Sequence, residues 1–228
     1  DPKSGKAMMS YSNEFHRRNA AKKWGEVTEL LTPVTDGTAG KHFQKGYLDS
    51  NNSERMQDAH AVMAVIAHTG FRIGAEKHLE EKGTRGAGTL AVENISIKGS
   101  RIDFKFIGKK DKENTGYIED KKLAEFLKDK IKGKKPGDRV FSSSYQDAND
   151  LCADVPFGKN VTPHNFRHVA GTVKAAEELA SRPIKLTGDK QADLEKIEKV
   201  INDASKAVAN HLSNTAATSR KTYIHPAL

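Results

Sequence analysis

The feature that most constrains this fold is a change of hydrophobic period near the middle of the chain. Apolar residues alternate with polar ones over residues 95–97 and again over residues 102–106, and Gly99 lies in the short segment between the two runs. Alternation with a period of two around a glycine turn is typical of a β-hairpin. A third short strand around residues 117–118 would complete a small antiparallel sheet.

On both sides of this block the apolar residues have helical spacing. The clearest case is residues 53–68, where Gly70 is a suitable helix stop. Thr162 and Pro163 suit a helix start, because threonine can cap and proline is tolerated at the first helical position. We predict helices over residues 53–68, 121–132, 163–179, 189–210 and 218–223. In the helix over residues 189–210 we expect these apolar side chains to face inward: Leu194, Ile197, Val200, Ile201, Ala204 and Val208. The predicted fold class is therefore mainly α, with one three-stranded antiparallel sheet.

The first 52 residues are interpreted as a basic leading segment and a loop. Residues 1–25 are polar, with Arg17, Arg18, Lys22 and Lys23 clustered, and residues 33–52 are rich in Gly, Thr, Asp, Asn and Ser. The sequence has no internal repeat, so residues 1–228 are predicted to form a single domain. Because the chain begins with Asp1 instead of Met, we expect a truncated or processed chain, or a start outside the numbering.

Composition favours an anionic partner. The 228 residues contain 38 Lys and Arg against 30 Asp and Glu, which gives a net charge of +8. A basic balance points most often to nucleic acid. The single cysteine, Cys152, allows no intrachain disulfide. The longest apolar stretch, residues 61–67, is far shorter than the roughly 20 residues of a membrane helix. With no visible signal peptide, we expect a cytoplasmic, nucleoid-associated or virus-associated protein and not a secreted one.

Five side chains in four separate segments suggest one chemistry. They are Arg72, Lys109, Arg167, Asn214 and Tyr223. A tyrosine can attack a phosphodiester, and arginines can grip the non-bridging oxygens and offset the charge that grows there. A lysine can protonate the leaving oxygen, and a polar amide can donate one more hydrogen bond. This set is what phosphodiester transfer without a metal requires.

Each of these residues has a plainer interpretation when taken alone. Arg72 could bind carbonyls at a helix end, Lys109 could be a solvated turn lysine, and Tyr223 could be a packing residue. Arg167 and His164 lie in a first helical turn, where cations oppose the helix dipole and so call for an explanation. The combination is what favours function over packing.

The order of these residues resembles type IB DNA topoisomerases of the poxvirus and bacterial kind. The resemblance covers nearly the whole chain, about residues 4–228. It includes the glycine- and threonine-rich segment at residues 86–90, and it is most specific at Asn214 and in the stretch from Arg220 to Pro226. It implies the catalytic fold that these enzymes share with tyrosine recombinases. The small N-terminal β domain of the family is absent from this sequence.

The resemblance also implies a role for each residue. Tyr223 matches the nucleophile, Arg72 and Arg167 match the phosphate-binding arginines, and Lys109 matches the general acid. Asn214 stands where the poxvirus-type enzymes have histidine and, as in bacterial members, would donate a hydrogen bond. His164, Lys110 and His211 are possible auxiliary residues. His164 three positions before Arg167 is more similar to tyrosine recombinases.

The resemblance implies a monomer acting on double-stranded DNA, with no cofactor, no metal and no membrane. Two other functions stay open on the sequence alone. One is a tyrosine recombinase that joins specific DNA sites, and the other is a DNA-binding module without catalysis.

Overall fold

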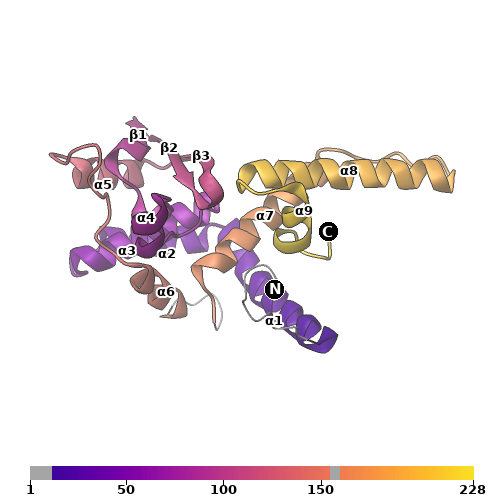
Figure 1. The fold of residues 1–228 in the computed structure, drawn as a ribbon, viewed down its shortest axis with the longest axis horizontal. Coiled ribbons are helices and arrows are strands. Elements are labelled where there is room, and N and C mark those ends of the chain that lie inside the picture. The colour runs from indigo at the N-terminus through magenta and orange to yellow at the C-terminus, as the bar shows by residue number, and fades with distance from the viewer. Residues whose placement is uncertain (1–11, 155–159) are drawn as a thin grey trace.

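The computed structural model describes residues 12–154 and 160–228 and is mainly helical (Figure 1). Its α-helices are α1 (Asn13–Thr35), α2 (Thr38–Leu48), α3 (Glu54–Thr69), α4 (Glu76–Lys82), α5 (Lys121–Ile131), α6 (Tyr145–Asp154), α7 (Pro163–Ala180), α8 (Lys190–His211) and α9 (Ala216–Thr218). The strands are β1 (Ile95–Lys98), β2 (Arg101–Gly108) and β3 (Lys112–Glu119). Short 3₁₀ turns span Ala87–Thr89, Val92–Asn94 and Lys109–Asp111, and a π-helical turn spans Ser219–Tyr223.

The predicted sheet is confirmed as a three-stranded antiparallel sheet in the order β1-β2-β3. Ile97 pairs with Ile102 across the first turn, and Gly99 takes a left-handed φ of 62° there. Alternate residues of β2 are buried, namely Ile102, Phe104 and Phe106, as the period of two requires. The third strand is longer than predicted, because it continues the β2 ladder back to the turn at residues 109–111.

Helix α3 is the centre of the core and confirms the helix predicted over residues 53–68. Ser53 caps its start by accepting a hydrogen bond from the Met56 amide, and Gly70 closes its end with a φ of 64°. The helix packs against α2, α6 and α7 and under the sheet. It therefore joins the sheet to the C-terminal helices, and the segment that follows Gly70 emerges between these two parts.

The prediction of a loop over residues 33–52 was wrong. Helix α1 continues through Pro33 to Thr35, and α2 follows after Gly37, whose φ is 80°. Ala39, Phe43 and Tyr47 recur at helical spacing and are buried in the core. Burial of this apolar face overcomes a glycine- and threonine-rich composition, which by itself favours a turn.

The expected inward position of Leu194 was also wrong, since its side chain is 47% exposed. Figure 1 shows the reason: the N-terminal half of α8 projects beyond α7, so α7 does not cover it. Farther along the same helix, Ala204 and Val208 are buried as predicted, where α8 packs against α7.

A buried ion pair ties α5 to α3 and to the segment before α6. Asp58 is fully buried, and its Oδ1 lies 2.9 Å from the Lys130 Nζ. Its Oδ2 accepts hydrogen bonds from the backbone amide and the hydroxyl of Ser142 at 2.7 and 2.8 Å. Lys130 also donates to the exposed Glu54 at 2.6 Å, so Asp58 is its buried partner and the shared acceptor of the two Ser142 donors.

We expect Asp58→Ala to lower the free energy of unfolding by about 3 kcal/mol, because Lys130 loses its buried partner and keeps only the exposed Glu54, and both Ser142 donors lose their acceptor. Urea denaturation would measure the change. Asp129→Ala, which removes an exposed carboxylate from the same helix as Lys130, is the matched control and should change stability by less than about 0.5 kcal/mol. Equal denaturation midpoints for the two variants would contradict this prediction.

Candidate active site

The end of α3 positions Arg72. The Thr69 hydroxyl accepts a hydrogen bond from the Phe71 amide at 3.1 Å and stabilises the turn after the helix. Phe71 then packs edge-on against Phe104 and Phe106 of the sheet, with ring centroids 5.8 and 5.0 Å away. Because Phe71 is anchored in this way, Arg72 leaves the core and lies at the pocket described below.

Arg72 connects two other residues of the predicted set. Its guanidinium donates a hydrogen bond to the Tyr223 hydroxyl at 3.4 Å and another to the Asn214 Oδ1 at 3.1 Å. The Asn214 Nδ2 is buried and has no hydrogen-bond partner among the described residues. Asn214 therefore holds Arg72 with its oxygen and keeps an unused donor beside the tyrosine.

Helix α7 presents Arg167 beneath the same tyrosine. The Arg167 side chain is 1% exposed, and its guanidinium lies 5.1 Å from the centroid of the Tyr223 ring. It donates to the carbonyl oxygens of Gly70 and Leu212, which end α3 and α8. Burial and the nearby charge of Arg72 lower the pKa of Arg167 to about 10, so the group stays cationic at neutral pH.

Tyr223 ends the π-helical turn and is 3% exposed. Its backbone packs closely on α7, where a Cβ at position 171 would lie 2.7 Å from the Tyr223 carbonyl oxygen, so glycine is required there. Thr172 donates to that same carbonyl at 3.3 Å. Burial raises the pKa of the Tyr223 hydroxyl. The charges and hydrogen bonds of Arg167 and Arg72 outweigh burial and leave this pKa below its usual value.

Two neutral histidines surround the tyrosine ring. His168 stacks on it with centroids 4.9 Å apart and planes 28° apart, and His164 meets it edge-on at 5.8 Å. Burial is the largest cause that lowers the pKa of His164 to about 4 and that of His168 to about 3, and nearby cations add to both shifts. At neutral pH the positive charge next to the tyrosine therefore comes from the arginines.

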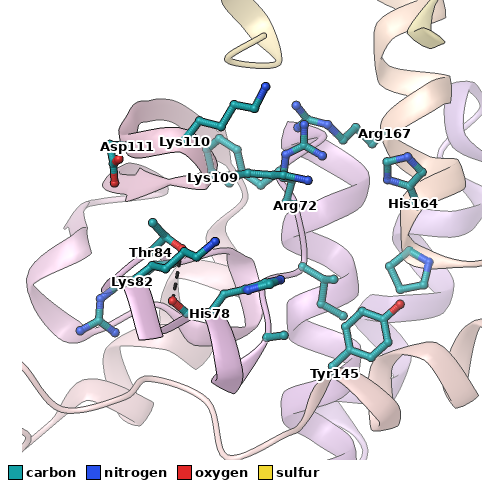
Figure 2. A pocket seen from close by; sticks show the side chains of 16 residues that line it. Arg72, His78, Lys82, Thr84, Lys109, Lys110, Asp111, Tyr145, His164 and Arg167 are labelled. Carbon is teal, nitrogen blue, oxygen red and sulfur yellow. Dashed lines mark hydrogen bonds between the residues drawn. The ribbon is translucent and has the colours of Figure 1, made fainter. Parts of the chain in front are cut away.

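Lys109 and Lys110 lie in the turn between β2 and β3. Both of them line the same pocket. Lys110 has a φ of 62°, which ends the alternation of side chains that the strand would impose. Figure 2 shows Lys109 reaching toward Arg72, while Lys110 extends in another direction from the same turn.

Arg72, Lys109, Lys110, His164 and Arg167 line an open pocket of about 910 Å³. Tyr223 and Asn214 are not among its lining residues and adjoin it through their contacts with Arg72. Its positive side chains come from the segment after α3, from α4, from the β2–β3 turn and from α7 (Figure 2): Arg72, Lys82, Arg85, Lys109, Lys110 and Arg167. Asp111 is the single carboxylate among the residues that line it. This arrangement suits a polyanion whose phosphate approaches the tyrosine.

His211 ends α8 and is half-buried outside the set of residues that line the pocket. Within residues 12–154 and 160–228, no group of three or more His, Cys, Asp or Glu side chains could hold a metal ion. In the same part of the chain, no helix has both the length and the apolar composition needed to span a membrane.

The sequence analysis did not single out three residues that contact the tyrosine segment. His168, Gly171 and Thr172 continue the spacing of His164 and Arg167 along one face of α7. That periodicity, at positions i, i+3, i+4, i+7 and i+8, was the available signal. Lys23 was noted only as part of a basic cluster, although its Nζ donates to the Thr222 carbonyl.

Comparison with known proteins identifies the family. The family model described as eukaryotic DNA topoisomerase I, catalytic core, matches residues 12–227. The chain therefore belongs to the DNA topoisomerase I catalytic-core family, as the sequence analysis expected. Comparison with curated protein sequences gave no significant match.

Among solved structures, the XerH site-specific recombinase bound to its difH substrate is similar to 79% of this chain. The TM-score is 0.47 and the sequence identity is 14%. The matched part amounts to 47% of the length of that chain.

Proposed function

We propose that the chain is the catalytic domain of a type IB DNA topoisomerase, which relaxes supercoiled DNA as a monomer on the duplex. The observation that carries this proposal is the contact of Arg72 with both the Tyr223 hydroxyl and the Asn214 amide. A nucleophile, an anion-binding cation and a hydrogen-bond donor thus meet at one point. Membership of the topoisomerase I catalytic-core family supports the same conclusion.

In the proposed reaction the Tyr223 oxygen attacks a backbone phosphorus and loses its proton to solvent. A tyrosine–phosphorus bond forms at the 3′ side, and the bond to the 5′ oxygen breaks. Lys109 donates a proton to that leaving oxygen, which becomes a 5′ hydroxyl. After rotation of the free end, the hydroxyl attacks the phosphotyrosine and the steps reverse. The reaction needs no ATP, because the covalent link conserves the energy of the broken bond.

The arginines have the role that a metal ion has in other phosphoryl-transfer sites. Arg72 and Arg167 would bind the non-bridging oxygens and stabilise the charge that develops there. The unused Asn214 Nδ2 would donate one further hydrogen bond. Since Arg167 already binds two carbonyl oxygens, its guanidinium is fixed in place before DNA arrives.

Incubation with supercoiled plasmid in EDTA without ATP tests the proposal. A ladder of relaxed topoisomers is the expected result. Site-dependent joining between two duplexes would instead indicate the recombinase, and binding without nicking would indicate a DNA-binding module without catalysis. Binding should weaken steeply as salt rises, because most contacts to DNA would be made with phosphates.

Arg72→Ala and Arg167→Ala are each expected to slow single-turnover cleavage by about 10²-fold or more, the cost of losing one oxyanion donor. Lysine at either position should rescue only part of the rate, because a point charge does not reproduce the planar fork. Arg220→Ala, which removes an exposed arginine near the same tyrosine, is the control and should cleave normally at saturating DNA. Full rescue by lysine at both positions would mean that the arginines act only as diffuse charge.

A further inference from the structure

Lys23 of α1 binds the backbone next to the tyrosine, although 199 positions separate it from its partner. Its Nζ donates a hydrogen bond to the Thr222 carbonyl at 3.2 Å. The ammonium also lies 3.9 Å from the centroid of the Trp24 indole. The side chain is half-buried, and a hydrogen bond from a charged donor is stronger than one between neutral groups.

The residues that follow Lys23 hold the same C-terminal segment. The Trp24 ring meets the His225 ring edge-on at 5.0 Å, and the Thr28 hydroxyl lies 3.4 Å from the His225 Nε2. Trp24 also meets His168, the ring that stacks on Tyr223, at 5.8 Å. Helix α1 therefore contacts the residues on both sides of the tyrosine, in addition to the contacts made by α7.

Lys23 differs from the neighbouring basic residues of α1. The Lys22 side chain is 66% exposed, and its ammonium lies 4.0 Å from the Glu26 carboxylate. Arg17 and Arg18 are exposed. Burial lowers the pKa of Lys23, and the negative charge of an ionised Tyr223 opposes that shift, so the ammonium lies within electrostatic reach of the tyrosine oxygen.

We propose that Lys23 is a positioning residue for Tyr223, which fixes the nucleophile by holding the Thr222 carbonyl. The inference rests on the proposed function. The basic cluster of α1 could bind DNA, but that role would not account for the contact between Lys23 and the Thr222 carbonyl. The inference therefore gives α1 a part in catalysis.

The test compares Lys23→Met, Lys23→Arg and Lys22→Met. Single-turnover cleavage is measured at saturating duplex, and DNA affinity and thermal melting are measured separately. Lys23→Met keeps the aliphatic stem over Trp24 but loses the donor, and it should slow cleavage by about 10-fold or more with little change in affinity. Lys23→Arg should restore most of the rate. Lys22→Met, the matched control, should cleave like the unmodified chain.

Equal cleavage rates for Lys23→Met and Lys22→Met would overturn the proposal. So would a loss of affinity with normal cleavage at saturation, because that pattern means that Lys23 binds DNA phosphate. If Lys23→Met does not fold, Lys23→Gln keeps a neutral donor and should give an intermediate rate. Tyr223→Phe, assayed in parallel, separates the two hypotheses: if it still cleaves, the proposed function fails, whereas normal cleavage by Lys23→Met alone rejects only this inference.

Discussion

Replacing Tyr223 with phenylalanine is expected to abolish plasmid relaxation and covalent capture of DNA, a loss of at least about 10⁴-fold. The change removes the proposed nucleophilic oxygen and one acceptor of Arg72. The ring can keep its stacking on His168, and Thr172 can keep its bond to the backbone carbonyl. DNA binding and the melting temperature should therefore change little. Denaturing gels that resolve the protein–DNA adduct would measure the loss.

The informative control is Tyr145→Phe. Tyr145 lines the pocket that Arg72 and Lys109 also line, and it is 49% exposed, so it is a second tyrosine that DNA could reach. It has no arginine within hydrogen-bonding distance among the contacts of the described residues, and we expect the variant to keep covalent capture. If Tyr223→Phe still formed the adduct and Tyr145→Phe did not, the nucleophile would be misassigned. Loss of the adduct in both variants would instead show that Tyr145 helps to place the substrate.

Local chemistry made much of this fold predictable. The hairpin was predicted correctly because its period of two and its glycine turn are independent signals for the same structure. The start of α7 was predicted because Thr162 and Pro163 are adjacent there, and Asn165 completes a capping box with Thr162. Helix α2 was missed because its glycines and threonines favour a turn locally, while the burial that stabilises it is tertiary.

The candidate site was predictable as a set of residue types but not as an arrangement. Arg72, Asn214 and Tyr223 could be selected from motif order, and the structure brings them within hydrogen-bonding distance. The support from Lys23 could not be seen in the sequence, because its partner carbonyl at Thr222 carries no side-chain signal. The turn that carries Lys110 has left-handed backbone, which a lysine rarely adopts, so strand periodicity does not determine where the side chains of this turn point.

The second large effect is expected from removing the proposed general acid, Lys109, which lies in the turn between β2 and β3. Lys109→Ala is expected to slow cleavage of ordinary DNA by about 10²–10⁴-fold, the usual contribution of a positioned proton donor. A substrate with sulfur in place of the 5′ bridging oxygen should be cleaved at a nearly normal rate, because a thiolate leaves without a proton. The position of Lys109 beside Arg72 in the pocket favours it as the donor (Figure 2).

Lys110→Ala is the matched control. Because Lys110 lines the same pocket, its removal should weaken binding in a salt-dependent way on both substrates, without selective rescue by sulfur. Selective rescue of Lys110→Ala instead would identify Lys110 as the acid. If sulfur rescued neither variant, the proton would come from another group. Of the other cations that line the pocket, the exposed Lys82 on α4 would be the next to test.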